Sequence, residues 1–288
     1  MGEKRRMFHE LQGNIAQLTA RQLQEPLKEI ALGTSAFGPL PEWRDWFHYL
    51  LGQLIPRSHE NENFVSSLLE SLVTGFIALY PNGIHNAPYA QFSEDALKTL
   101  GQCIMDPRCW NGEEIVVGSF LHRSNDNPAK IWFWWDASGD FSGSMYFCMK
   151  YLPVDLVREW FSSVLAIQSP HWRAQVLVWL VGSHELLQGH VQWPSEFAED
   201  AYPKVSWEWS HCLQPELTVA DDNSNVPPAP SLVPQSSREL VLEVAREYFT
   251  SDVYLSWLES LALAPYLVSE LGAIPSTFEA LYVEHGDV

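Results

Sequence analysis

Apolar side chains recur every three or four residues along much of this chain. The pattern is clearest over residues 64–80, where a wide apolar stripe is formed by Phe64, Val65, Leu68, Leu69, Leu72, Val73, Phe76, Ile77 and Tyr80. A stripe of that width predicts an α-helix that packs against two neighbours rather than one. The same spacing over 154–167, and again after Pro170, predicts two more helices of this kind. Shorter helices are expected after Pro41 and from Ser93 to about Met105.

Turn and capping residues indicate how these helices connect. The tripeptide Gln168-Ser169-Pro170 lies between two predicted helices that each have a wide apolar stripe, which is typical of an antiparallel helical hairpin. Two capping boxes, Ser236 with Glu239 and Ser276 with Glu279, predict further helix starts. The segments recur about every 15–20 residues, so we expect a mostly α fold of stacked antiparallel helical hairpins. This pairing resembles HEAT-like repeats in outline only.

One region interrupts the helical pattern. Residues 114–122 and 130–136 are rich in β-branched and aromatic side chains, and strong turn residues lie between them at 124–128. This predicts a β-hairpin inserted near 114–136, followed by a Gly/Ser loop over 138–144.

Three tryptophans in the second predicted strand are candidate partner-binding residues. Successive side chains of a strand point to opposite faces, so Trp132, Trp134 and Trp135 cannot all face one covered side. Either the helical body buries both faces, or one face is a docking ridge on which tryptophan is the natural anchor.

The chain divides by composition into three parts. We expect a helical body with the hairpin insertion over 1–219, a Pro/Ser/Asn-rich linker over 220–236 and a C-terminal helical segment over 237–288. A segment of about fifty residues is marginally stable alone, which favours packing on the body. A separate interaction tail is the alternative.

Charge limits the classes of partner. The chain carries 36 acidic and 17 basic side chains, for a formal net charge of −19, together with 13 tryptophans. Nucleic-acid affinity comes largely from lysine and arginine, so a nucleic-acid binder is disfavoured. The acidity either keeps the protein soluble or speeds encounter with a basic partner.

Membrane insertion and secretion are not expected. The longest apolar runs, such as 176–181, are far shorter than the ~20 residues of a membrane helix. No secretory signal follows the basic start at 4–6, and the cysteines lack a paired spacing. Reduced thiols in a cytoplasmic protein are therefore expected of Cys103, Cys109, Cys148 and Cys212.

One short motif points to a cation site. Residues 140–144 read Asp-Phe-Ser-Gly-Ser, which resembles the metal-ion-dependent adhesion site of von Willebrand A-type domains. The resemblance implies that Asp140, Ser142 and Ser144 bind a hard cation through oxygen atoms. In that family the motif ends a buried strand, whereas helices are expected here. A Gly/Ser loop that caps the next helix is the competing interpretation.

Three other sets contain metal-ligand residue types, but none completes a known site. They are His184, Glu185 and His190; Glu208 and His211; and Cys103, Cys109 and His122. The Glu-x-x-His pair has the spacing of di-iron bundles but no second such pair in the chain. The chain also lacks a phosphate-binding loop, a dinucleotide fingerprint and a nucleophile elbow. We therefore expect no cofactor and lean away from an enzyme.

These observations favour a non-enzymatic module that binds another protein, as an adaptor, regulator or inhibitor. It would use a helical platform with an acidic surface and tryptophan anchors. The alternative is a metal-dependent enzyme or a von Willebrand A-like cation site centred on Asp140, Ser142 and Ser144.

Overall fold

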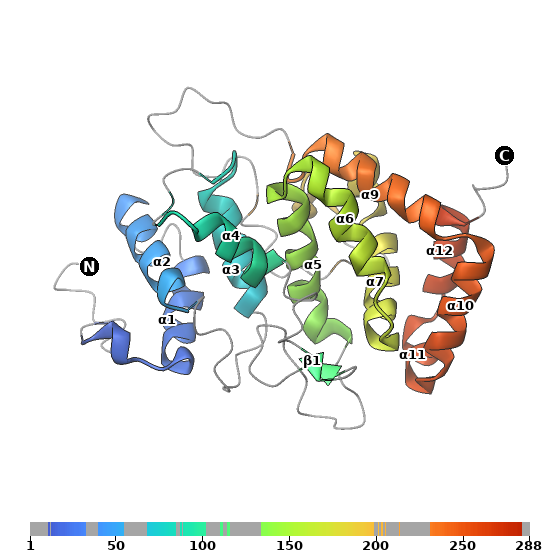
Figure 1. Cartoon of the computed structure of the whole chain (residues 1–288), viewed down its shortest axis with the longest axis horizontal. Helices are drawn as coiled ribbons and strands as arrows, with labels where there is room; N and C mark the ends of the chain where they lie inside the picture. Colours follow the sequence, from blue (N-terminus) through green and yellow to red (C-terminus); the bar gives the residue numbers. More distant parts are fainter. Residues whose placement is uncertain are drawn as a thin grey trace.

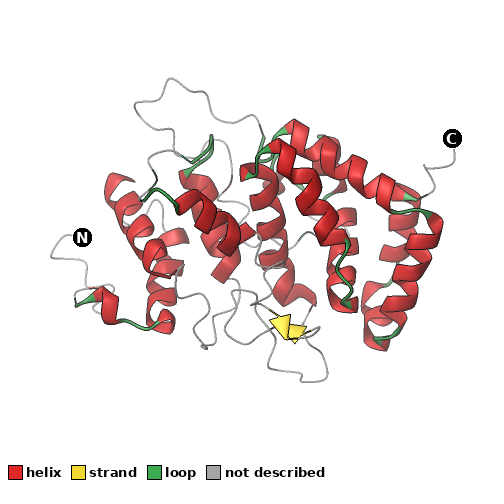
Figure 2. Cartoon of the chain, viewed as in Figure 1, coloured by secondary structure: helices red, strands yellow, loops and turns green. Residues whose placement is uncertain are grey.

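The computed structural model is mostly helical, which confirms the fold class expected from the periodicity (Figures 1 and 2). The structure describes the following residues: 11, 13–32, 40–54, 68–84, 87, 89–101, 110–111, 114–115, 134–198, 201, 203, 205, 213 and 231–283. Among these residues, no helix combines the length and apolarity needed to cross a membrane.

The amino-terminal elements are short to medium helices and one pair of short strands. They are η2 (Ile15–Gln17), α1 (Ala20–Leu32), α2 (Leu40–Leu54), α3 (Leu68–Leu79), α4 (Phe92–Ala96), η4 (Leu97–Gly101), β1 (Trp110–Asn111) and β2 (Glu114–Ile115). The η4 turn is a π-helix that continues α4 without a break.

The remaining elements are helical. They are α5 (Trp134–Tyr151), α6 (Val154–Leu165), α7 (Pro170–Gly182), α8 (His184–Gln188), η7 (Pro194–Glu196), α9 (Gln235–Tyr248), α10 (Ser251–Ala262), α11 (Pro265–Leu271) and α12 (Ile274–Tyr282). In Figure 1, α1 and α2 lie at one end of the long axis and α10–α12 at the other.

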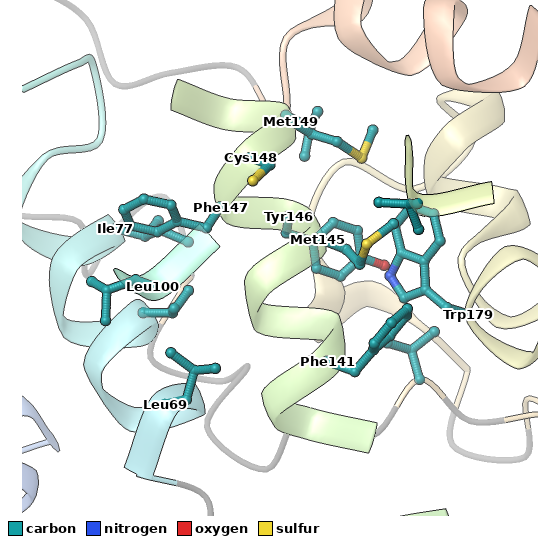
Figure 3. Close-up of a cluster of buried hydrophobic side chains, with 14 of the residues drawn as sticks. Leu69, Ile77, Leu100, Phe141, Met145, Tyr146, Phe147, Cys148, Met149 and Trp179 are labelled. Carbon is teal, nitrogen blue, oxygen red and sulfur yellow. The ribbon is translucent and has the colours of Figure 1, made fainter. Parts of the chain in front are cut away.

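Helix α5 forms the centre of the core. It packs against α3 and η4 on one side and against α7 on the other (Figure 3). The Phe147 ring lies 4.9 Å from that of Phe76 on α3, while the Tyr146 ring lies 5.6 Å from that of Trp179 on α7. Residues 141–149 are all buried, as expected for a helix between two layers.

Small residues allow the close packing around α5. At Gly101 of η4, a Cβ would lie only 2.7 Å from the Cys148 sulfur. The buried Ser144 hydroxyl donates a 2.6 Å hydrogen bond to the Leu100 carbonyl. The Gly/Ser loop predicted over 138–144 is therefore wrong, because these residues lie within α5 and bring it against its neighbours.

The inserted β-hairpin is also not supported. Residues 114–115 pair with 110–111, in the register Trp110 to Ile115 and Asn111 to Glu114. Residues 134–136, predicted to end the second strand, begin α5 instead, and 116–133 lie outside the described residues. The preference of aromatic residues for strands depends strongly on context. Here α5 packs between two layers, and its first turn includes the end of the aromatic segment predicted as a strand.

Helices α6 and α7 follow one another as predicted, but the HEAT-like stack is not supported. Their side chains meet where the Phe161 and Trp179 rings lie 6.4 Å apart. However, α6 packs chiefly on α9, while α7 packs on α10, α11 and α12. The helices therefore pair with partners distant in sequence, and not with the next helix in a repeated order.

The predicted capping boxes place the two helix starts two and three residues too late. Helix α9 begins at Gln235, with Pro234 as its N-cap, and α12 begins at Ile274. Ser236 and Ser276 therefore lie inside the first turn, where the Ser276 hydroxyl donates to the Ala273 carbonyl at 2.9 Å. Proline near a helix start fixes a helical φ without losing a needed N–H group. The same helix start ends the predicted linker at Pro234, and residues 220–230 lie outside the described residues.

Candidate protein-interaction surface

Two of the three candidate tryptophans begin a helix instead of ending a strand. Trp134 and Trp135 are the first two residues of α5, and Trp132 lies outside the described residues. Adjacent helical residues are about 100° apart, so the alternation of a strand does not apply to Trp134 and Trp135.

The residues of the cation motif are separated by the helix that contains them. Residues two apart on an α-helix lie about 200° apart around its axis, so Ser142 lies on the opposite side from Asp140 and Ser144. Ser142 and Ser144 are both buried, and the Ser144 hydroxyl donates to Leu100. Ser142 and Ser144 therefore do not share one side of α5.

We expect millimolar magnesium or calcium to leave the thermal unfolding midpoint unchanged, because a cation that binds only the folded state would raise it. Ser144→Ala should lower the unfolding free energy by about 1 kcal/mol, since it removes a buried hydrogen bond. Thermal unfolding with and without each cation checks both expectations. A cation-dependent rise that Ser144→Ala abolishes would contradict this interpretation.

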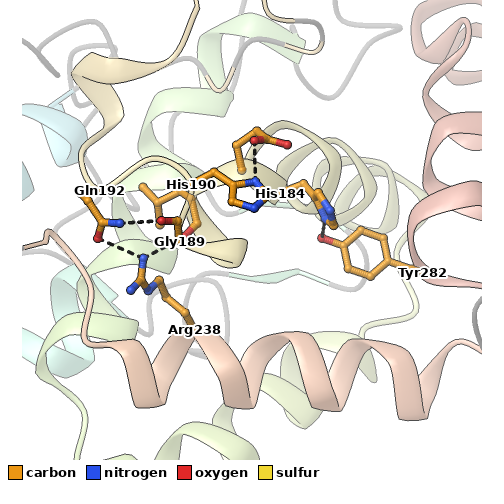
Figure 4. Close-up of polar contacts among 8 residues, drawn as sticks. His184, Gly189, His190, Gln192, Arg238 and Tyr282 are labelled. Atoms are coloured by element: carbon orange, nitrogen blue, oxygen red, sulfur yellow. Dashed lines mark hydrogen bonds and ion pairs between the residues drawn. The ribbon is translucent and has the colours of Figure 1, made fainter.

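The histidines near α8 each contact a different partner (Figure 4). His184 Nδ1 lies 3.1 Å from the Tyr282 hydroxyl, whereas His190 Nδ1 lies 2.9 Å from a Glu185 carboxylate oxygen. Within the described part of the chain, no three His, Cys, Asp or Glu side chains are grouped as metal ligands. The candidates Glu208, His211, Cys103, Cys109 and His122 lie outside that part.

Arg238 fixes the end of α8. Its guanidinium donates to the Leu186 carbonyl at 3.3 Å and to Gln192 Oε1 at 3.2 Å (Figure 4). Gly189 ends the helix with a φ of +82°, a conformation that favours glycine, and a Cβ there would lie 3.1 Å from the guanidinium. This group therefore attaches α9 to α8.

Buried hydroxyls join α5, α7 and α12. Tyr146 and Ser183 share a 2.7 Å hydrogen bond, and the Tyr282 hydroxyl donates to the Leu180 carbonyl at 2.9 Å. Burial raises the pKa of both tyrosines well above the ordinary value. The phenols are therefore neutral at physiological pH, and the Ser183 hydroxyl bonds to a neutral phenol, so this cluster has a structural role.

The C-terminal helices present a surface of a different kind. Residues 251–283 contain no lysine, arginine or histidine, and their charged side chains are Asp252, Glu259, Glu270 and Glu279. Three large apolar side chains in the same region are mostly exposed, Leu255 by 56%, Leu263 by 80% and Val268 by 57%. Exposed aliphatic side chains among carboxylates, in a segment without basic residues, make this region a candidate interaction surface.

The neighbouring surface at α6 and α9 is electrostatically different. Arg158 on α6 forms ion pairs with Glu243 and Glu247 on α9, the latter at 2.8 Å. These carboxylates are partly neutralised within the molecule. By contrast, α10, α11 and α12 contain no cation of their own that could pair with their acidic residues.

We define the acidic–apolar face as the exposed side of α10 with the start of α11. Its members are Asp252, Leu255, Ser256, Glu259, Ala262, Leu263 and Val268. The sequence analysis did not single out these residues. The sequence feature that could have identified this surface is the absence of basic residues from 247 to 284.

Comparison with known proteins gives no relative from which a function could be inferred. No protein family, no curated protein and no solved structure matches the chain.

Proposed function

We propose that this protein is a non-enzymatic module that binds another protein, as an adaptor, regulator or inhibitor. Its partner carries a positively charged surface, and the C-terminal helices α10–α12 meet it. The observation that carries this proposal is the absence of lysine, arginine and histidine from residues 251–283, where acidic residues lie next to exposed aliphatic side chains.

Electrostatics supports a basic partner over other classes. With a net charge of −19, the protein repels nucleic acids, anionic membrane surfaces and its own copies. A basic surface is attracted, and its encounter with α10–α12 is accelerated most at low ionic strength.

The described core supports a binding role over a catalytic one. Three of its buried hydroxyl groups have structural partners, since Tyr146 and Ser183 bond to each other and Ser144 donates to the Leu100 carbonyl. A cation site at Asp140, Ser142 and Ser144 is less favoured, because Ser142 lies on the opposite side of α5 from Ser144.

We expect neutralisation of the C-terminal carboxylates to abolish partner capture. The variant combines Asp252→Asn, Glu259→Gln, Glu270→Gln and Glu279→Gln. The immobilised wild-type protein should retain a stoichiometric protein from native extract, with retention falling as salt rises. The variant should bind that protein about tenfold more weakly or not at all, because it lacks the attracting charges.

A matched control removes the same number of charges elsewhere. It combines Glu29→Gln, Asp45→Asn, Asp155→Asn and Glu159→Gln, all exposed on α1, α2 and α6. Each set includes one aspartate in the first turn of its helix, so their effects on helix stability are similar. The control should retain the partner. The proposal fails if no stoichiometric protein is captured at any salt concentration, or if both variants retain it equally.

A further inference from the structure

The exposed side of α10 combines apolar and acidic side chains in one continuous stripe. Asp252, Leu255, Glu259 and Leu263 are all exposed and lie within about 120° around the helix axis. On the buried side, Tyr254, Trp257 and Leu261 face the core. Helix α10 is therefore apolar on both sides, although its inner side is sufficient to anchor it.

The start of α11 extends this stripe. Ala264 is the N-cap of α11, so Leu263 and Val268 occupy the N′ and N4 positions, which lie side by side at a helix start. Both side chains remain mostly exposed, so their apolar surface is left available at the start of α11.

Charge decides which occupant fits the face. Asp252 and Glu259 flank Leu255 on α10, and Glu270 lies on α11. A second copy of this chain would bring like charges together at a cost, and an anionic lipid surface would do the same. A helix with an apolar stripe flanked by lysine or arginine would bury the aliphatic side chains and pair the carboxylates.

We propose that the acidic–apolar face binds a basic amphipathic helix of the partner protein. Apolar side chains of that helix cover Leu255, Leu263 and Val268, while its cations meet Asp252 and Glu259. This inference rests on the proposed function and adds to it the docking point and the chemistry of the bound segment.

The molecule offers a matched control surface. Val154 and Leu156 on α6 are also exposed, by 46% and 44%, but they lie beside Arg158, whose guanidinium is paired with α9. A basic helix gains less there, because part of the nearby acidity is already neutralised.

The test uses a synthetic peptide about five helical turns long, with leucine on one face and lysine on the other. A scrambled peptide of the same composition has the same charge but no continuous leucine face, so its affinity measures the contribution of charge attraction alone. The wild-type protein should bind the ordered peptide at least about tenfold more tightly than the scrambled one, since only the ordered peptide buries the aliphatic side chains together. Titration followed by chemical shifts measures both affinities.

Two serine variants locate the binding. Leu255→Ser with Leu263→Ser and Val268→Ser should abolish the preference for the ordered peptide, whereas Val154→Ser with Leu156→Ser should preserve it. Thermal unfolding of each variant verifies folding, and exposed substitutions of this kind alter stability little. An unchanged preference in the triple variant, or equal loss in the double variant, would overturn the inference.

Retention of the captured partner by the two variants shows whether the docking point or the proposed function is wrong. If the carboxylate variant loses the partner while the triple serine variant retains it fully, the function holds and the docking point is wrong. If the carboxylate variant retains the partner, the proposed function itself fails.

Discussion

Trp179→Ala is expected to lower the free energy of unfolding by about 3–5 kcal/mol, the largest stability effect that we predict. Trp179 is almost fully buried on α7, and its ring contacts those of Tyr146 and Phe161 at centroid distances of 5.6 and 6.4 Å. Truncation to alanine removes one of the ring contacts between α5 and α7 and leaves a cavity that rigid helices refill only partly. Urea denaturation followed by circular dichroism measures the change.

Trp179→Phe is the matched control for this substitution. The indole N–H of Trp179 is buried and has no hydrogen-bond partner among the described residues. Phenylalanine keeps an aromatic ring and removes that unpaired donor, so it should cost less than half as much as alanine. A loss below about 1 kcal/mol for Trp179→Ala would show that α5 and α7 do not pack as described.

The second large effect is a rise in stability with pH that depends on Lys150. This lysine is partly buried at the end of α5, where its Nζ donates to the Leu232 carbonyl at 3.0 Å. Burial disfavours the charged amine and lowers its pKa to about 8. Between about pH 8 and the ordinary lysine pKa of roughly 10.4, the unfolded chain therefore binds more protons than the folded protein.

When the unfolded chain binds more protons than the folded protein, the free energy of unfolding increases as the pH rises. We expect Lys150 to contribute a gain of about 2 kcal/mol between roughly pH 7.5 and 9.5, and Lys150→Met to remove this gain. The window ends below pH 10, because the buried tyrosines with raised pKa values destabilise the fold once unfolded phenols ionise. Urea denaturation of both proteins at the two pH values checks the expectation.

Lys98→Met supplies the comparison. Lys98 is exposed and paired with Glu94, so its removal should leave the pH dependence of stability unchanged. Equal slopes for wild type and Lys150→Met would mean that the Lys150 amine is fully solvated in the folded protein.

The helical class could be predicted from the sequence because apolar spacing directly records which faces are buried. The stripe from Leu68 to Leu79 is fully buried in α3, as its width predicts. The α5 region was misassigned because its glycine and serine residues are typical of loops. The reason for small residues in α5 is the close approach of η4, where the Ser144 hydroxyl donates to the Leu100 carbonyl. That approach could not be predicted from the sequence.

The pairing of helices was not accessible from local spacing. The turn at Ser169 and Pro170 has the features of a hairpin connection, and α7 does begin at Pro170. Yet α6 packs mainly on α9, which lies about seventy residues further along the chain, and such long-range choices depend on shape and volume.

The candidate interaction surface was equally hidden from sequence reasoning. Leu255 has the same chemistry as Leu261, and only the fold reveals that one is exposed while the other is buried. Clustered tryptophans drew attention to residues 132–135 because tryptophan often anchors interfaces. The exposed aliphatic side chains Leu255, Leu263 and Val268 lie in the C-terminal segment that contains no basic residue.

Site-specific photo-cross-linking tests the central claim most directly. A photoreactive side chain replaces Leu255 in one protein and Leu156 in another, and both are irradiated in native extract. We predict one dominant cross-linked protein at position 255, with a net positive charge and a basic helix at the attachment point. A dominant product at position 156 instead, or a cross-linked partner at 255 with an acidic surface, would contradict the account.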